Sequence, residues 1–154
     1  MELSSLLTPE AVRSASTYSS KKRLFQELGE LAGGLYGISS ADTCSAFLER
    51  EALGPTGVGK GIALPHARIA GLTEIHAMFF KVEKPMDFGS VDRQPVDLIF
   101  ALLAPQDSGV DHLKALALVS RTMRDPNLCT KLRANNDPAT LHTLLVSEQG
   151  SQAA

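Results

Sequence analysis

A nearly unbroken apolar run in the second half of the chain constrains the fold most strongly. Residues 96–103 read Val-Asp-Leu-Ile-Phe-Ala-Leu-Leu. A short run of this kind is typical of a central strand that is covered on both faces. The uninterrupted stretch from Leu98 to Ala104 is far shorter than the roughly 20 residues that span a bilayer, so no membrane insertion is expected. A strand buried on both faces needs helices on both sides of its sheet, which predicts a layered α/β fold.

Two further strands and two helices are predicted before this run. The strands are Gly61–Pro65 and Ile75–Val82, and the second is followed by the turn-forming pair Lys84-Pro85. Ser20 is a good N-cap for a helix. Apolar residues then repeat at helical spacing, at Leu24, Leu28, Leu31, Ala32 and Leu35. The glycines at 33, 34 and 37 are expected to end this helix. A second helix begins near Asp42 and stops by Gly54-Pro55.

The final third is predicted to be helical. Ser108, with Asp111 three residues later, indicates a capping box at the start of a helix. The side chains expected on the inner face of this helix are those of Leu113, Leu116, Ala117, Ser120 and Met123. Asp125-Pro126 and Asp137-Pro138 start two more helices, because proline suits the first helical position. The whole chain, 1–154, is therefore expected to form one α/β domain with its sheet sandwiched between helices, an ordered core of about 3–146 and a short flexible C-terminal tail.

Composition excludes several classes of function. The 15 Lys and Arg against 17 Asp and Glu give a formal net charge of −2, so no basic field favours nucleic acid or an anionic membrane as a partner. The N-terminal residues lack the features of a secretory signal. Only Cys44 and Cys129 are present, which is no disulfide framework and is typical of a reducing compartment. A cytoplasmic location is expected.

A glycine-rich segment nearly matches a nucleotide-binding motif. Residues 54–61 read Gly-Pro-Thr-Gly-Val-Gly-Lys-Gly, but Gly61 stands where a phosphate-binding loop needs a Ser or Thr hydroxyl for magnesium. A helix precedes the segment and a strand follows it, which is the reverse of the order that such a loop requires. We interpret it as a connector in which glycines allow positive φ and close approach of the backbone.

Two of the four histidines stand at positions suited to chemistry. His66 follows an apolar strand and Pro65, and sites in α/β sheets lie beyond the carboxyl ends of strands. His112 lies in the first turn of a predicted helix, where N–H groups and the helix dipole favour an anion. His76 is expected at the sheet edge or in solvent, and His142 on the surface.

These positions indicate phosphoryl transfer through a phosphohistidine, since a neutral imidazole is a good nucleophile near pH 7. Such a site needs cations, and the candidates near in sequence are Arg50, Lys60 and Arg68. The spacing of the histidines matches no metal-ligand pattern, and neither a metal nor another cofactor is expected.

Three segments resemble one known family. Residues 48–66, from Leu-Glu-Arg to Pro-His, together with the segment from Asp97 to Pro105 and the sequence His112-Leu113-x-x-Leu116, are similar to the mannitol/fructose-type enzyme IIA proteins of the bacterial phosphotransferase system. Within the family the nitrogen-related branch is most similar. The resemblance extends from about Leu3 to Leu145.

The resemblance implies a mixed sheet and a phosphocarrier activity. It implies that His66 accepts a phosphoryl group from an HPr-like carrier protein, that His112 orients this group, and that Arg50 balances its charge. It further implies a backbone wall beside the phosphorylated ring formed by Thr56, Gly57, Gly59 and Gly61. Arg68 is expected to contact the carrier protein.

The output of the phosphorylation stays open between three alternatives. The nitrogen-related branch implies regulation of partner proteins in nitrogen and potassium homeostasis, such as potassium transport or sensor kinase proteins. A sugar-specific enzyme IIA would instead pass the phosphoryl group to a separate IIB protein. A non-catalytic regulatory binding module would act by surface contact alone.

Overall fold

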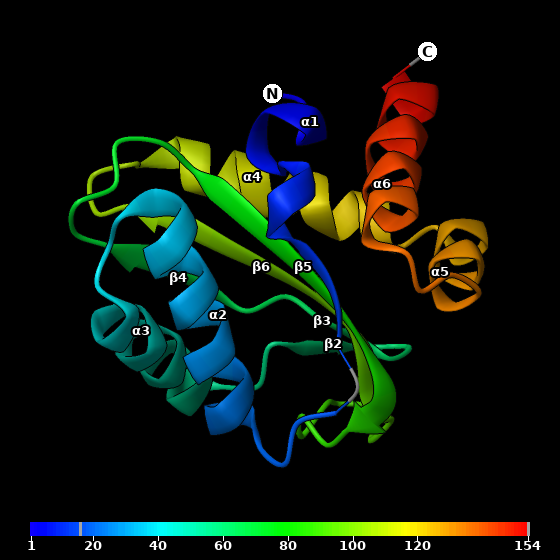
Figure 1. Ribbon diagram of the computed structural model, residues 1–154, viewed down its shortest axis with the longest axis horizontal. Helices are drawn as coiled ribbons and strands as arrows, with labels where there is room; N and C mark the ends of the chain where they lie inside the picture. Colours follow the sequence, from blue (N-terminus) through cyan, green and yellow to red (C-terminus); the bar gives the residue numbers. More distant parts are fainter. Residues whose placement is uncertain (16, 154) are drawn as a thin grey trace.

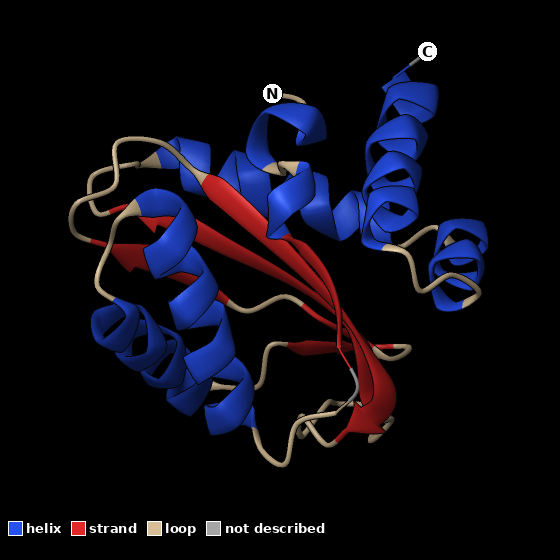
Figure 2. Cartoon of the chain, viewed as in Figure 1, coloured by secondary structure: helices blue, strands red, loops and turns tan. Residues whose placement is uncertain are grey.

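Helices cover both faces of one mixed sheet in the computed structural model (Figure 1), which describes residues 1–15 and 17–153 and, among these, no side chain of residues 15 and 148–153. The helices are α1 (Leu3–Leu6), α2 (Lys21–Tyr36), α3 (Ser40–Leu53), α4 (Val110–Met123), α5 (Pro126–Arg133) and α6 (Pro138–Ala153), with a 3-10 turn at Pro9–Ala11. The strands are β1 (Val12–Ala15), β2 (Gly57–Gly59), β3 (Ile62–Ala63), β4 (His66–Ile69), β5 (His76–Met86) and β6 (Val96–Pro105). Helices α2 and α3 lie on one side of the sheet, and α1, α4 and α6 lie on the other (Figure 2). The predicted α/β sandwich is confirmed.

Strand β6 is the centre of the sheet. The strand order is β1-β5-β6-β3-β2, and β4 also pairs with β6. The pairing of β6 is antiparallel with β5 but parallel with β3 and β4, which makes the sheet mixed. Residues 98–104 have a relative exposure of 0%. The apolar run within residues 96–103 is therefore part of the central strand, as predicted.

The first two helices are fixed by the residues that the sequence indicates. The Ser20 side chain accepts a hydrogen bond from the backbone N–H of Arg23 at 3.1 Å, and Gly37 ends α2 in the left-handed conformation with φ 70°. Helix α2 passes through Gly33 and Gly34 without ending. The second helix begins two residues before Asp42, at Ser40, where the Ser39 side chain caps it.

Two predictions for the strands are wrong in extent. Strand β5 continues through Lys84-Pro85 to Met86, with an irregular register against β6 between Lys81 and Met86. Because the ladder is broken there, the missing N–H of Pro85 is tolerated. The predicted strand Gly61–Pro65 is reduced to Ile62–Ala63, and the chain rejoins β6 as β4 from His66 onward.

The prediction for the start and inner face of α4 is also wrong. Gly109 is the N-cap residue, no side chain caps the helix, and the Ser108 hydroxyl has no partner among the described residues. The buried side chains of α4 are those of His112, Ala115, Leu118, Val119, Thr122 and Met123, whereas Leu113 is 63% exposed. The inner face is rotated by about one residue from the predicted one, and this rotation turns His112 inward.

The two ends of the chain complete the sheet and its outer layer. Strand β1, which the sequence analysis did not predict, pairs in parallel with β5 at the sheet edge. Helix α5 begins after its Asp125 cap as predicted, and Leu128, Cys129 and Leu132 are buried. The backbone of α6 extends to Ala153; Ala154 and the side chains from residue 148 lie outside the described residues, so the predicted flexible tail stays a prediction. In the described part of the chain, no helix is both long enough and apolar enough to cross a membrane.

Candidate functional site

Four side chains from three elements meet beside β4. Strand β4 supplies His66 and Arg68, which alternate with the buried Ala67 and Ile69 and therefore share a face of the strand. Helix α3 supplies Arg50, and the first turn of α4 supplies His112. The site is a shallow depression of about 460 Å³ whose lining includes these four residues and Leu53. His66 opens β4 and does not follow a strand as predicted, but the sheet is interrupted beside it at Leu64-Pro65.

The backbone sets the tautomer of His66. Nδ1 of His66 lies 2.9 Å from the carbonyl oxygen of Leu64. A carbonyl only accepts, so Nδ1 carries the proton and Nε2 keeps a free electron pair. The Leu64 N–H in turn donates to the carbonyl of Thr56 at 2.9 Å. The backbone thus presents Nε2 of His66 as the nucleophilic nitrogen.

Arg50 lies against this nitrogen. Its Nε–H donates to Nε2 of His66 at 3.2 Å, and one of its Nη atoms donates to the Gly54 carbonyl at the end of α3 at 3.0 Å. The second bond fixes the guanidinium at the helix end, where a cation is favourable. The site therefore holds a positive charge directly beside the atom that would be modified.

His112 has the opposite tautomer. The Nε–H of Arg68 donates to Nδ1 of His112 at 3.2 Å, so Nδ1 is the acceptor and the proton is on Nε2. This Nε2–H is buried and has no hydrogen-bond partner within the described residues. The rings of His112 and His66 meet edge to face, with centroids 5.6 Å apart and an interplanar angle of 68°. A buried, unpaired donor beside a nucleophile is unusual, because such a group costs about 1–3 kcal/mol.

Both histidines are held neutral by their surroundings. Burial is the main cause that lowers the pKa of His66, and Arg50 lowers it further, against an opposing effect of the Leu64 carbonyl. Burial also lowers the pKa of His112, followed by the neighbouring His66 and Arg68. A neutral imidazole is the form that can attack phosphorus.

The structure does not bring the predicted glycine wall to the two histidines. The nearest neighbours of a Cβ placed on Gly57, Gly59 or Gly61 would be Ser90, Asp92 and Arg133 respectively. These glycines shape a tight turn between β2 and β3, with φ of 98° at Gly59 and 79° at Gly61. The glycines lie outside the lining of the depression.

Thr56 does not line the depression but supports the backbone beside it. Its N–H and its hydroxyl both donate to the carboxylate of Glu51, which also accepts from Lys21 at 2.9 Å. Since the Thr56 carbonyl holds Leu64, this cluster supports the backbone that orients His66. The helix-then-strand order around 54–61 agrees with the argument against a nucleotide loop.

The other histidines lie elsewhere. His76 stacks on Tyr36 with ring centroids 3.9 Å apart. His142 is not merely a surface residue as predicted, because its Nε2 lies 2.9 Å from the Leu7 carbonyl and links α6 to the N-terminal segment. Among the residues that the structure describes, no group of three or more His, Cys, Asp or Glu side chains is arranged to hold a metal ion.

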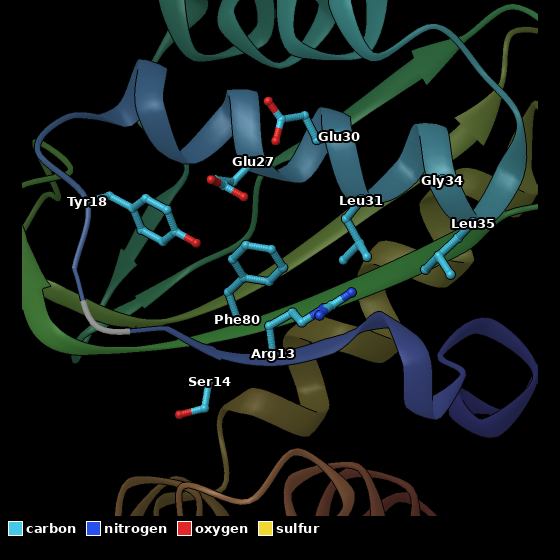
Figure 3. A pocket seen from close by; sticks show the side chains of 9 residues that line it. All are labelled: Arg13, Ser14, Tyr18, Glu27, Glu30, Leu31, Gly34, Leu35 and Phe80. Atoms are coloured by element: carbon cyan, nitrogen blue, oxygen red, sulfur yellow. The ribbon is translucent and has the colours of Figure 1, made fainter.

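A separate groove lies between α2 and β1 (Figure 3). It has a volume of about 450 Å³, and Phe80, Leu31 and Tyr18 contribute ring or aliphatic surface beside Arg13, Glu27 and Glu30. Neither His66 nor His112 lines it. Its mixed charges are on exposed or half-exposed side chains, and we do not place the candidate site there.

Two features of the site could not be read from the sequence. One is the Leu64 carbonyl, since backbone groups carry no sequence signal. The other is a set of exposed aliphatic side chains, one in the lining of the depression and two on α4 next to His112 in sequence: Leu53 is 84% exposed, Val110 60% and Leu113 63%. Their helical spacing resembles that of core residues, and only the orientation of the helices shows that they face outward.

The comparisons with known proteins agree on one family. Residues 5–148 match the model of the phosphoenolpyruvate-dependent sugar phosphotransferase system, EIIA 2. The nitrogen regulatory protein of Bradyrhizobium diazoefficiens is 43% identical over 145 residues, covering 94% of this chain and 95% of that protein. The nitrogen regulatory protein of Escherichia coli (strain K12) is 37% identical over 152 residues, covering 98% of this chain and 93% of that protein.

A solved structure agrees with the sequence matches. The nitrogen regulatory protein IIA-Ntr from Neisseria meningitidis superimposes with a TM-score of 0.85 at 31% identity, covering 93% of this chain and 98% of that one. The predicted family resemblance and fold are therefore confirmed.

Proposed function

The chain belongs to the EIIA 2 family of the phosphoenolpyruvate-dependent sugar phosphotransferase system, and from this premise we propose that it is a phosphocarrier of the nitrogen branch which accepts a phosphoryl group on Nε2 of His66. The single observation that carries the proposal is the pair of opposite tautomers: Nε2 of His66 carries an unprotonated electron pair, held by a hydrogen bond from Arg50, in a site that also contains an unpaired N–H of His112. The names of the similar proteins support the nitrogen branch.

The chemistry exchanges one P–N bond for another. The electron pair on Nε2 of His66 attacks the phosphorus of a phosphohistidine on the donor protein, and the donor's P–N bond breaks as its imidazole leaves with that electron pair. Nδ1 of His66 keeps its proton throughout and donates it in a hydrogen bond to the Leu64 carbonyl. When the donor ring likewise keeps a proton on its other nitrogen, it leaves as a neutral imidazole and no net proton is taken up or released. Because one P–N bond forms as another of the same kind breaks, the transfer can run in both directions.

The arginine and the second histidine stabilise the transferred group. Arg50 must give up its bond to Nε2 before the attack, and its guanidinium can then bind the phosphoryl oxygens while the bond to Gly54 keeps it nearby. The Nε2–H of His112 is a preformed donor for another phosphoryl oxygen. A phosphoryl group brings about −1.5 to −2 charges, which the guanidinium of Arg50 offsets in part.

The rim of the depression supports a protein donor. Leu53, Val110 and Leu113 are exposed aliphatic side chains on the two helices that flank the histidines. Exposed apolar groups around a polar centre are typical of protein interaction sites. We propose an HPr-like carrier as the partner that docks on this rim, with the exposed Arg68 able to reach its surface.

The proposed output is regulatory. Addition of a dianionic group to a neutral histidine changes the charge of the rim locally, and such a change can attract or repel a partner. We propose that proteins of nitrogen or potassium homeostasis respond to this change and that the protein works in the cytoplasm, which the two free cysteines, Cys44 and Cys129, support.

An in vitro transfer assay tests the proposal. The protein is incubated with phosphoenolpyruvate, enzyme I and either a nitrogen-type or a sugar-type HPr-like carrier, and acid-labile phosphate on the chain is measured. We expect labelling of wild type and of the control His76→Ala, whose ring is remote from the site, and no labelling of His66→Ala. Equal labelling of His66→Ala would refute the assignment.

The choice of carrier separates the alternatives. Faster labelling by the nitrogen-type carrier is expected, whereas a preference for the sugar-type carrier together with onward transfer to a IIB protein would indicate a sugar-specific enzyme IIA. Absence of labelling with both carriers would leave a binding module that acts by contact alone.

A further inference from the structure

Arg68 has a set of contacts that carrier docking does not explain. Although the residue is exposed, its Nε–H donates to Nδ1 of His112 at 3.2 Å, and its two Nη groups donate to the carbonyls of Gln106 and Gly109, each at 3.3 Å. The three donors of one planar guanidinium thus converge on the second histidine and on the loop before it. A side chain whose only role was to meet a partner would need none of these bonds.

We propose that Arg68 is a positioning residue: it holds His112 in the tautomer that carries its proton on Nε2 and fixes the loop before α4 so that this N–H is presented to the group transferred to His66. The inference rests on the proposed function for the identity of that group. The tautomer itself concerns the unmodified protein and can be tested separately.

The loop provides the first argument. It joins the end of β6 to α4, Gly109 in it has φ 58° and ψ −129°, and none of the described side chains caps the helix that follows. The start of α4 therefore lacks the usual capping bond. The two bonds from Arg68 to carbonyls on either side of Ser108 are the side-chain contacts that tie this loop to β4. His112 is the third residue of α4, so movement of the loop would move its ring.

The tautomer provides the second argument. A neutral imidazole has one donor and one acceptor nitrogen, and a partner that can only donate selects the acceptor. Arginine is such a partner, since it has five N–H groups and no acceptor. Its presence at Nδ1 leaves the proton on Nε2, where the structure offers it no other partner among the described residues. The positive charge of Arg68 also disfavours a second proton on the ring, and it lowers the pKa of His112 together with burial and His66.

At His66, too, the group that contacts Nδ1 selects the tautomer, but there that group is an acceptor. There an acceptor, the Leu64 carbonyl, selects the tautomer with a proton on Nδ1 and leaves Nε2 as the nucleophile. At His112 a donor selects the opposite tautomer and leaves Nε2 as the hydrogen-bond donor. One site thus contains a nucleophile and a donor of the same residue type, and their different roles are assigned by the group that contacts Nδ1.

Nitrogen-15 NMR of the histidine rings tests the inference, because protonated and unprotonated ring nitrogens have well-separated chemical shifts. In the unmodified wild-type protein we expect a protonated Nε2 on His112 and a protonated Nδ1 on His66. A wild-type His112 with its proton on Nδ1 would overturn the inference at once, whatever the variants do.

Two variants then remove the spaced hydrogen-bond donors or the positive charge of Arg68. Arg68→Lys keeps the charge but offers one ammonium where three spaced donors are needed, and Arg68→Gln removes the charge. Both are expected to move the His112 nitrogen shifts toward averaged values while those of His66 stay unchanged. The matched control is Arg121→Lys, an exposed arginine on α4 itself. Unaltered His112 shifts in both Arg68 variants would overturn the inference.

Transfer kinetics separate this inference from the proposed function. Removal of a single preorganised donor typically slows a reaction about 100- to 1,000-fold, so loosening the donor is expected to slow transfer to His66 about tenfold in Arg68→Lys. Wild-type transfer rates in both Arg68 variants would refute the positioning role. If wild type itself accepts no phosphoryl group, the proposed function fails, while the wild-type nitrogen shifts still decide the tautomer.

Discussion

The unpaired Nε2–H of His112 predicts that one substitution improves stability while it damages function. In His112→Leu the buried donor is removed, which relieves a cost of about 1–3 kcal/mol. The variant also loses the bond from Arg68, worth about 1 kcal/mol, but Arg68 is exposed and water can replace that partner. The balance favours the variant by about 1 kcal/mol, which corresponds to a rise in melting temperature of about 2–4 °C for a chain of this size.

Urea unfolding and the transfer assay are run on the same preparations. The transfer rate to His66 is expected to fall about 100-fold or more, since a preorganised donor is lost from the transition state. The control is Leu118→Ala, which lies on the same helix, is 4% exposed and has its side chain in the hydrophobic core; it is expected to lose about 2–5 kcal/mol and to keep its transfer rate. If His112→Leu is destabilised by more than 1 kcal/mol, the N–H is paired in solution and the reasoning is wrong. If it transfers at the wild-type rate, the donor has no part in the reaction.

Three further predictions concern pH, helix packing and a buried lysine. Because burial lowers the pKa of His66 below its ordinary value of 6.5, Nε2 stays unprotonated to lower pH, and the rate of phosphoryl acceptance should fall with a midpoint below 6.5; a midpoint at or above 6.5 contradicts this. The unfolded chain takes up that proton at higher pH than the folded one, so the free energy of unfolding should also decrease as the pH drops below 6.5. Gly29→Ala would place a Cβ 2.5 Å from the Ser40 carbonyl oxygen and is expected to cost about 1–3 kcal/mol in urea unfolding, whereas Gly34→Ala, with no atom within 4 Å, should gain up to about 1 kcal/mol; equal effects would show that α2 and α3 are not in close contact. Lys81→Met should cost about 3 kcal/mol, because its ammonium donates to three acceptors at and just after the C-terminal end of α5, and a loss below 1 kcal/mol in the same assay would contradict that assignment.

The sequence was most informative where one signal dominated. The apolar run from residue 96 needs two covered faces, and the structure places it at the centre of the sheet. Ser20 and Asp125 cap the helices they were expected to cap, because a capping side chain acts on N–H groups only two or three residues away. Local chemistry of this kind does not depend on the rest of the fold.

The errors arose where tertiary contacts override a local pattern. Pro85 normally ends a strand, but an irregular register lets β5 continue past it. On α4, Leu113 was expected on the inner face, yet it is 63% exposed and the neighbouring His112 is buried. Gly57, Gly59 and Gly61 were expected beside the ring of His66; the β2–β3 turn carries them away, toward Ser90, Asp92 and Arg133 respectively. In each case the deciding contact comes from a segment distant along the chain.

The arrangement of the site explains how one residue type can take two roles in a reaction that must run in both directions. A carrier has to bind the phosphoryl group firmly enough to accept it and loosely enough to give it up, so strong fixed charges on the group would be a disadvantage. Here both histidines are neutral, Arg50 already has the Gly54 carbonyl as a partner, and Arg68 is committed to His112 and its loop. Transfer to His66 therefore exchanges hydrogen bonds within a preformed site, and we expect the backbone to move little. A large pattern of amide shifts far from His66 on phosphorylation would contradict this view, since it would mean that the charge is accommodated by refolding and not by side chains that are already in place.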